Sequence, residues 1–336
     1  MKDFNVGVIG CGAISGNHFH AIAKTENAAL RAVCDIDEAK LQKAMKEQGV
    51  EGYTDYHDLL ARTDIDAVHV CVPHYLHARI SIDALRAGRH VLCEKPMGMT
   101  IQEAQAMKQA ANESGKTLTI CFQNRYNGAS LRMKEIIDSG ELGKVTGGSA
   151  FVCWDRNGAY YASCPWRGSW KTEGGSVLIN QSIHTLDLLR WLAGGFTLKQ
   201  ATMTAKRLAD IIETEDTCDM LLENKEGDRF VFYCTNCASD NENIYLHLNL
   251  EKGQLHMDGA RLTIITPDGA KLEDFSVAKG VGKDYWGAGH THFIADYYHR
   301  LGEGLPPFIT ADDALETTRV MDAAYHGHAP IRARQD

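Results

Sequence analysis

The sequence has no apolar run long enough to span a bilayer, and no basic stripe that would offset its acidic balance locally. Lys and Arg total 35 against 44 for Asp and Glu, which gives a formal net charge of −9. Nucleic acid and anionic membranes are therefore not expected as partners. The first residues show no charged leader followed by an apolar stretch, so we expect a cytoplasmic protein.

Internal repeats and low-complexity tracts are absent too. The 336 residues are 44% hydrophobic and 24% charged, which is the composition of a globular protein with a sizeable core. At this length two domains are expected.

The cysteines form no pattern typical of a disulfide framework. Four of the ten lie in or at the end of strand-like runs rich in Val, Ile and Leu: Cys34, Cys71, Cys93 and Cys121. A free cysteine in such a run acts as a small buried hydrophobe, so we expect reduced thiols. Cys234 and Cys237 have the spacing of a zinc or redox half-site, but there is no second pair, and in a strand the two thiols would point to opposite faces. We expect no metal site.

The first 122 residues alternate short β-branched runs with amphipathic segments. The predicted strands are Asn5–Ile9, Leu30–Cys34, Ala67–Val72, His90–Cys93 and Leu118–Phe122. Asp37 is predicted to cap a helix over residues 38–48, and Thr100 with Glu103 forms a capping box for a helix that ends near Ser114. This order predicts an α/β fold with a doubly wound parallel sheet and helices on both faces.

After Phe122 the pattern changes to longer strand-like runs separated by hairpin-type turns. The turns are at residues 225–228, 251–253 and 267–269, and helical patterns cover residues 130–139, 176–192, 290–302 and 311–325. The second part is therefore predicted to be α+β with a mostly antiparallel sheet. We expect residues 1–123 to form a dinucleotide-binding domain and residues 124–336 a domain for substrate binding and oligomerisation.

A glycine-rich turn follows the first predicted strand. Gly10 and Gly12 match the first two glycines of G-x-G-x-x-G, while Ser15 stands at the third position. The first glycine permits a tight turn, and the second lets the backbone approach a pyrophosphate. The phosphates would meet the amides of a helix that begins near Ala13 and Ile14.

The context of this turn strengthens the signal. The second predicted strand ends in Asp35, 23 residues after Gly12, close to the separation expected for the acid that binds the adenosine ribose. The alternative is a glycine turn followed by a solvated or capping Asp. Because a carboxylate there would repel a 2′-phosphate, NAD is expected in preference to NADP.

Charged residues appear abruptly at the end of the predicted strand over residues 90–93. Glu94, Lys95 and Pro96 lie at the carboxyl edge of the sheet, where α/β proteins bind ligands. An ammonium there can stabilise a developing alkoxide. The alternative is a Glu–Lys pair on a solvated loop.

A second polar group lies on the helical stretch that follows Gly174 and Gly175. Asn180, His184 and Asp187 have the spacing i, i+4 and i+7, which places them on one helix face. A helical His is often only a satisfied core residue, but this one has polar neighbours.

Together these motifs resemble the Gfo/Idh/MocA family, the glucose-fructose oxidoreductase and inositol dehydrogenase group. The resemblance implies a Rossmann domain, a second domain with an open antiparallel sheet, and a homodimer or homotetramer. The family's active-site Lys maps onto Lys95, and its acid/base His onto His184. Many members carry Asp four residues before that His, where this chain has Asn180, which can orient a hydroxyl but supplies no charge.

Other site residues follow from the same resemblance. The implied cofactor contacts are Gly10, Gly12, Ala13, Ile14, Asp35, Pro73, His77, Glu94, Lys95, Asn124 and Arg125, and the implied substrate contacts are Trp166, Arg167, Asn180 and His184. The loop of Trp166 and Arg167 is interpreted either as a wall of the substrate cleft or as a surface anchor. Trp286 and His290 have the same two interpretations, and His18 is interpreted either as a site residue or as an ordinary helix residue.

The expected reaction is transfer of a hydride between NAD and a secondary alcohol of a sugar, glycoside or cyclitol. His184 would take the hydroxyl proton, Lys95 would stabilise the oxygen, and Asn180 would orient the substrate. Similarity to branches with the Asn-Gln-Ser-Ile-His and Tyr-Trp-Gly stretches suggests oxidation at C3 of a glucoside. Two alternatives are an NAD-retaining enzyme that cleaves glycosides through a keto sugar and a non-catalytic dinucleotide sensor.

Overall fold

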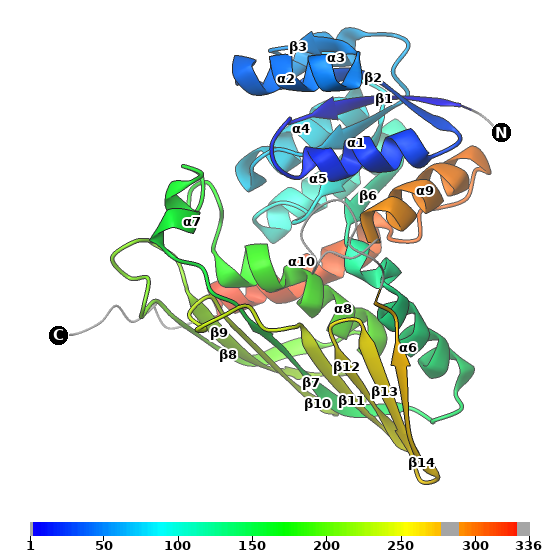
Figure 1. Ribbon diagram of the computed structural model, residues 1–336, viewed down its shortest axis with the longest axis vertical. Coiled ribbons are helices and arrows are strands. Elements are labelled where there is room, and N and C mark those ends of the chain that lie inside the picture. Colours follow the sequence, from blue (N-terminus) through cyan, green and yellow to red (C-terminus); the bar gives the residue numbers. More distant parts are fainter. Residues whose placement is uncertain (1–2, 277–288, 328–336) are drawn as a thin grey trace. The chain divides into compact units, whose positions relative to one another are not determined.

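The computed structural model describes residues 3–276 and 289–327 (Figure 1). The chain forms two compact units. Unit 1 comprises Met1–Gln123 and Lys279–Thr318, and unit 2 comprises Asn124–Ala278 and Arg319–Asp336. The late stretch Lys279–Thr318 thus belongs to unit 1. The division expected from the sequence, 1–123 and 124–336, placed this stretch in the second domain.

Unit 1 is built on a six-stranded, wholly parallel sheet. Its strands are β1 (Phe4–Ile9), β2 (Ala28–Cys34), β3 (Glu51–Tyr53), β4 (Ala67–Val70), β5 (His90–Glu94) and β6 (Leu118–Cys121). The order β3-β2-β1-β4-β5-β6 is that of a dinucleotide-binding Rossmann sheet. The β-branched core of β1 and β4 is completely buried because helices cover both faces of a parallel sheet. The five strands predicted from the sequence are confirmed, and the short β3 is an addition.

The helices of unit 1 form two layers on its sheet (Figure 1). They are α1 (Ser15–Lys24), α2 (Glu38–Gln48), α3 (Tyr56–Ala61), α4 (His74–Arg86), α5 (Ile101–Ser114) and α9 (Gly289–Gly302), and α10 (Ala311–His326) begins in this unit. The helix α4 packs on α5, and α1 packs on α9. The pairing of α1 with α9 is what brings the late segment back to unit 1.

Local capping signals in the sequence are confirmed. The side chain of Asp37 accepts hydrogen bonds from the backbone N–H groups of Ala39 and Lys40 at the start of α2. The Thr100 hydroxyl oxygen accepts a hydrogen bond from the backbone N–H of Glu103 at the start of α5. These side chains stabilise helix N-termini that would otherwise have unsatisfied donors.

Unit 2 is built on an eight-stranded sheet with the order β14-β13-β12-β11-β7-β10-β9-β8. Its strands are β7 (Val145–Cys153), β8 (Thr197–Thr204), β9 (Thr217–Glu223), β10 (Arg229–Thr235), β11 (Tyr245–Leu250), β12 (Gly253–Asp258), β13 (Arg261–Thr266) and β14 (Gly269–Asp274). All neighbours are antiparallel except β7 and β10, which pair in parallel. The three predicted turns connect β9 to β10, β11 to β12 and β13 to β14, as expected.

The helical segments of unit 2 are η1 (Gln123–Tyr126), α6 (Gly128–Ser139), α7 (Gly158–Ala162), the π-helix η2 (Val177–Ser182) and α8 (Ile183–Ala193). Figure 1 shows α6 and α8 against one face of the sheet, and α8 packs on β7. Along β10, Phe230 and Phe232 are buried while Val231 is 46% exposed. In the described part of unit 2, helices therefore cover one sheet face and leave the other open.

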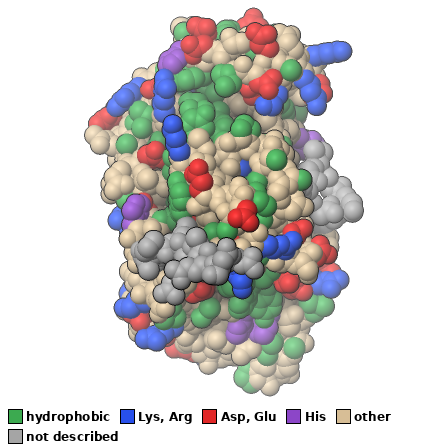
Figure 2. Space-filling view, turned by 90° about the vertical axis from the view of Figure 1, so that its left-hand side faces the viewer, with side chains coloured by type: hydrophobic (Ala, Val, Ile, Leu, Met, Phe, Trp, Pro, Cys, Tyr) green, Lys and Arg blue, Asp and Glu red, His purple; other side chains and the backbone are tan. Residues whose placement is uncertain are grey.

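The sequence composition also led to expectations about cysteines, charge and membrane spans. All ten cysteines are free thiols. On the face in Figure 2, acidic and basic side chains are interspersed over the coloured surface and do not gather by sign. Among the residues that the structure describes, no helix combines the length and the hydropathy that a bilayer crossing requires.

Candidate active site

The glycine-rich turn connects β1 to α1 and has the conformation that its residues require. Gly10 has φ = 99°, and a Cβ there would lie 2.3 Å from the backbone oxygen of Cys71. At Gly12, by contrast, a Cβ would meet nothing within 4 Å, so the backbone is open to a ligand. Only glycine fits the first position, and the second offers the close approach that a pyrophosphate needs.

Ser15 explains the imperfect third glycine of this motif. It is the first residue of α1, it is buried, and its hydroxyl donates to the backbone oxygen of Gly12 over 2.7 Å. The side chain therefore stabilises the turn instead of obstructing it. Ala13 and Ile14 lie in the turn directly before α1, so backbone N–H groups of the helix start are close to Gly12.

Asp35 lies directly after β2 and beside the same turn. Its Oδ2 accepts from the backbone N–H of Cys11 over 2.7 Å, and its Oδ1 accepts from the backbone N–H of Asp37 over 2.8 Å. Two backbone donors thus hold the carboxylate at the glycine turn. Glycines, helix N-terminus and carboxylate together fit a nicotinamide dinucleotide.

The carboxyl ends of β4 and β5 supply the next group of residues. Pro73 precedes α4, and the side chain of Lys95, which directly follows β5, is half-buried. The Lys95–Pro96 peptide bond is cis. The imidazole of buried His77 lies 2.9 Å from the backbone oxygen of Pro96 and 2.8 Å from that of Val72. His77 therefore connects the segment after β4 to the segment after β5.

Glu94 is the centre of a buried hydrogen-bond network in unit 1. Its Oε1 lies 3.0 Å from Nε2 of His18 on α1 and 3.4 Å from Nε2 of His290 on α9. Beyond it, Nδ1 of His18 lies 2.9 Å from Nδ1 of His69, whose Nε2 lies 2.8 Å from the hydroxyl of Tyr298. Burial alone would raise the pKa of Glu94, but the hydrogen bonds from the two histidines outweigh it and hold that pKa well below its usual range.

Among the residues that the structure describes, this cluster brings together a set of donor atoms that could hold a metal ion. The donor atoms of His18, Glu94, Cys121 and His290 all lie within 4.8 Å of one another. Within this set, Glu94 Oε1 is within hydrogen-bond distance of both imidazoles.

In unit 2, two polar side chains emerge from an otherwise buried segment. From Gly175 to Arg190 every residue is buried except Asn180 and His184, which are each half-buried. Asn180 lies in the π-helix η2, and His184 lies in the first turn of α8. A short π-helix at a helix start frequently marks a functional site.

Asp187 does not share that exposed position. It is buried and forms a bidentate ion pair with Arg125, with 2.7 Å from Nε to Oδ2 and 2.6 Å from Nη2 to Oδ1. The expected common face of Asn180, His184 and Asp187 assumed one uniform α-helix, whereas the segment begins as a π-helix. The Arg125 guanidinium also stacks on the Trp191 ring, 5.2 Å from its centroid, so it anchors α8 to η1.

Two buried carboxyl groups contact the segment around Asn180. Glu173 Oε1 accepts from Nδ2 of Asn180 over 2.5 Å. Glu215 Oε1 accepts from the backbone N–H groups of Ser176 and Leu178 and from the hydroxyl of Tyr325. Burial raises the pKa of both carboxyl groups, for Glu173 to about 7.

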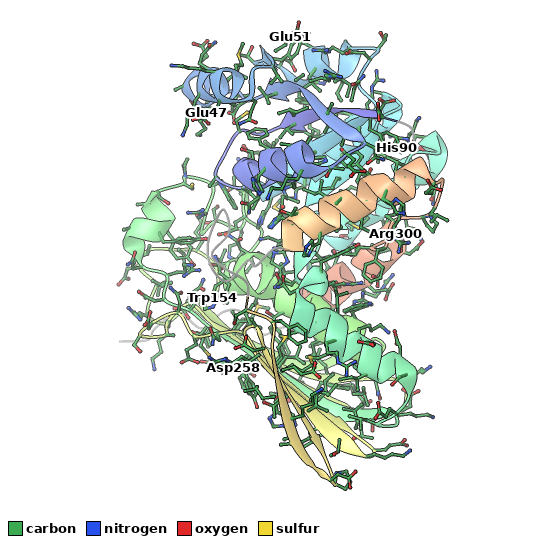
Figure 3. All side chains as sticks on the ribbon, turned by 45° about the vertical axis from the view of Figure 1, so that its right-hand side comes forward. Glu47, Glu51, His90, Trp154, Asp258 and Arg300 are labelled. Atoms are coloured by element: carbon green, nitrogen blue, oxygen red, sulfur yellow. The ribbon has the colours of Figure 1, made fainter. Side chains whose placement is uncertain are left out.

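Trp166 and Arg167 belong to a stack of alternating aromatic rings and guanidinium groups. The Arg167 guanidinium lies 4.1 Å from the ring centroid of Tyr160 and 5.6 Å from that of Trp166. The Arg156 guanidinium lies 5.2 Å from Tyr160 and 4.9 Å from Trp154, which Figure 3 places just beyond the end of β7. Because Gln181 donates to the Tyr160 hydroxyl over 2.9 Å, the stack is connected to η2.

The structure thus gathers the predicted residues into two groups, one in each unit. Unit 1 carries Gly10, Gly12, Ala13, Ile14, Asp35, Pro73, His77, Glu94 and Lys95, and unit 2 carries Asn124, Arg125, Trp166, Arg167, Asn180 and His184. His18 and His290 lie in the Glu94 network, and Trp286 lies outside the described residues. The sequence analysis missed Glu173, although a charged residue directly before Gly174 and Gly175 was a signal that could have been read.

Comparison with known proteins agrees with this geometry. Residues 4–122 match a family model described as "Oxidoreductase family, NAD-binding Rossmann fold", and residues 130–256 match the "GFO/IDH/MocA C-terminal domain". Unit 1 is thus the NAD-binding Rossmann domain of an oxidoreductase. The chain belongs to the Gfo/Idh/MocA family, which confirms the resemblance, the fold class and the cofactor expected from the sequence.

Relatives over most of the chain have related names. Inositol 2-dehydrogenase of Salmonella typhimurium is 28% identical over 308 residues, covering 90% of this chain and 87% of that protein. The WlbA dehydrogenase of Bordetella pertussis, solved with NADH and UDP-GlcNAcA, is 28% identical with a TM-score of 0.83, covering 98% of this chain and all of that one. An oxidoreductase of Agrobacterium radiobacter has a TM-score of 0.87 at 20% identity, covering 97% and 98% of the two chains, and shows the fold.

Proposed function

We propose that the protein oxidises a secondary alcohol of a sugar, glycoside or cyclitol with NAD. The observation that carries the proposal is that Asn180 and His184 are the only residues of the fully described segment Gly175–Arg190 that are not completely buried. Two relatives named above, an inositol dehydrogenase and a dehydrogenase solved with a nucleotide sugar, support a polyol substrate.

Each of three side chains has a role in this proposal. His184 takes the proton of the reacting hydroxyl as general base, for which a partly solvated imidazole is suited. The Lys95 ammonium stabilises the oxygen as negative charge develops. Asn180 hydrogen-bonds the substrate and orients it. NAD, when bound, supplies the hydride acceptor.

The proposed cofactor contacts are the residues expected from the sequence. Gly10, Gly12, Ala13 and Ile14 accommodate the pyrophosphate, and Asp35 accepts hydrogen bonds from the adenosine ribose hydroxyls. Pro73, His77, Glu94, Lys95, Asn124 and Arg125 are the further proposed contacts. Because His77 and Arg125 are buried and bonded within their own units, they act mainly by holding neighbouring backbone in place.

The test is a panel of sugars, glycosides and cyclitols assayed for NADH formation, with NADP in parallel. Lys95→Ala and His184→Ala are expected to lower kcat/KM for the best substrate by about 10²-fold or more while NAD still binds. The matched controls Lys43→Ala and His299→Ala change exposed residues and are expected to keep wild-type turnover. Unchanged turnover in both site variants would disprove the roles. Release of a glycosidic leaving group at a catalytic amount of NAD would favour the glycoside-cleaving alternative.

A finer part of the proposal concerns the position oxidised. The Asn-Gln-Ser-Ile-His stretch at residues 180–184 supports C3 of a glucoside. A glucoside that lacks the 3-hydroxyl is then expected to bind without reducing NAD. NADH formation from that analogue would show that another carbon reacts.

We also propose that the chain forms a homodimer or homotetramer through the open face of the eight-stranded sheet. Val231 on β10 and Leu272 on β14 are 46% and 61% exposed, and the rings of Phe151, Tyr233 and Tyr245 lie side by side on neighbouring strands. Light scattering with Val231→Glu tests this surface, because a buried charge there would dissociate the oligomer. A wild-type monomer at all concentrations would contradict it.

We further propose a cytoplasmic location, which the free cysteines support.

A further inference from the structure

A carboxylate that the sequence analysis did not identify makes a direct contact with Asn180. Glu173 lies in the loop between α7 and η2 and has no exposed surface. Nδ2 of Asn180 donates to its Oε1 over 2.5 Å, and the backbone N–H of Gly168 donates to its Oε2 over 2.5 Å. Each carboxylate oxygen therefore accepts at least one hydrogen bond.

These contacts determine which way the Asn180 amide points. An asparagine amide has a donor arm and an acceptor arm at opposite sides of the same carbon. Because the donor arm is directed to buried Glu173, the acceptor arm, Oδ1, is on the side away from it. An acceptor beside a reacting hydroxyl group can receive a hydrogen bond from its O–H and so orient the substrate. A donor in the same place cannot.

We propose that Glu173 is a positioning residue that keeps Asn180 Oδ1 directed toward the substrate, and that protonation of Glu173 turns the amide around. This inference rests on the proposed function, in which Asn180 orients the substrate. A protonated carboxyl group carries a donor O–H, so its best partner on Asn180 is the carbonyl oxygen. The NH₂ group then takes the place of the oxygen and presents a donor where the substrate needs an acceptor.

The surroundings of Glu173 place this change near neutral pH. Burial raises its pKa to about 7, against the opposing hydrogen bonds from Gly168 and Asn180. The nearby Glu215 carboxyl adds to the rise, and the Arg167 guanidinium opposes it. Among the described residues, the ionisable groups that act on Glu173 include Glu215, Arg167, Tyr160 and Tyr161. Since both tyrosines have raised pKa values, they stay neutral in this range.

Glu173 can also supply the negative charge that Asn180 lacks. Asn180 has no charge of its own, but it is bonded to a group that becomes negative above its pKa. The pair Glu173–Asn180 can thus do what a single carboxylate at position 180 would do. The two residues are seven apart in sequence, so the loop before η2 must fold back for them to meet.

The first experiment compares kcat/KM against pH for the wild type and Glu173→Gln. Glutamine keeps an oxygen for the Gly168 N–H and offers its NH₂ to Asn180 Oδ1, so it fixes the turned amide at every pH. Both profiles share the pH dependence of the general base His184, so the ratio of wild-type to Glu173→Gln kcat/KM isolates Glu173. This ratio is expected to rise from about 1 at low pH to about tenfold at high pH, the effect of one hydrogen bond, with a midpoint near about 7 as Glu173 ionises.

Two further variants separate positioning from folding. Glu213→Gln is the matched control, because Glu213 is exposed, accepts from Ser169 and Trp170 in the same loop and does not contact Asn180. It is expected to keep the wild-type profile. The exchange Glu173→Gln/Asn180→Asp restores an acceptor, since the glutamine NH₂ can donate to one oxygen of Asp and leave the other for the substrate. Activity is expected to return, with only the pH dependence that the general base His184 imposes.

A readout without turnover distinguishes this inference from the proposed function. In ¹⁵N-labelled protein, the side-chain NH₂ resonances of Asn180 are expected to shift with a midpoint near about 7, and not to shift in Glu173→Gln. If the wild type oxidises no alcohol but the resonances shift, the proposed function fails and the amide reorientation stands. Resonances that do not change with pH, or a Glu173→Gln profile like that of the wild type, would overturn the inference.

Discussion

Replacing Asp187 with Asn tests whether the ion pair with Arg125 anchors the helix that carries His184. Both side chains are 1% exposed, and the carboxylate receives two hydrogen bonds from one guanidinium. Removing one partner of a buried ion pair costs about 3–5 kcal/mol, because the other charge stays buried without compensation. Since Asn keeps one acceptor oxygen, we expect a loss of about 3 kcal/mol, at the lower end of that range.

The assay is hydrogen exchange of the backbone amides of α8, which reports the local free energy of opening. Amides of Ile183–Ala193 are expected to exchange about 10²-fold faster in the variant, while those of β5 in unit 1 keep their rate. Asp219→Asn, an exposed change in unit 2, is the control and is expected to cost less than about 0.5 kcal/mol. The double change Arg125→Met/Asp187→Leu should recover most of the loss. A cost below about 1 kcal/mol in Asp187→Asn would refute the anchoring role.

Three further predictions concern the glycine turn and Asp35 in unit 1 and Glu173 in unit 2. Asp35→Ala is expected to weaken NAD binding and to narrow the preference for NAD over NADP, measured by NADH and NADPH fluorescence titrations; an unchanged preference would contradict the role of the carboxylate. Gly10→Ala places a Cβ 2.3 Å from a backbone oxygen and should lower the melting temperature and abolish NAD binding, whereas Gly12→Ala should fold normally and lose NAD affinity only. The raised pKa of Glu173 favours its protonated form in the folded state, so its contribution to stability is present below about pH 4.5 and is lost as the pH rises through about 7. Glu173→Gln should therefore gain unfolding free energy relative to the wild type over that window, by about 3 kcal/mol at most, and a pH-independent difference in urea denaturation would contradict the assignment.

Features that depend on neighbouring residues were predictable from the sequence. Asp37 and Thr100 cap helices through contacts two or three residues away, and a capping pattern contains that information completely. The same holds for Gly10 and Gly12, whose turn follows from their lack of a side chain. Asp35 is further away in sequence, but a standard strand–helix–strand unit sets its distance from the glycines.

Features that depend on the return of distant segments were not predictable. Glu94 meets His18 and His290, which come from α1 and α9, and no spacing in the sequence indicates that contact. The parallel pairing of β7 with β10 is equally non-local. Within η2, α-helical periodicity does not apply because the segment is a π-helix, and the contact of Glu173 with Asn180 was not foreseen.

The most direct test of the account is reduction of NAD by a panel of sugars, glycosides and cyclitols, followed with wild type, Lys95→Ala and His184→Ala. The account predicts NADH formed in proportion to ketone product by the wild type, with both variants binding NAD but turning over about 10²-fold more slowly or less. Tight NAD binding without oxidation of any compound in the panel, or turnover that survives both substitutions, would contradict it.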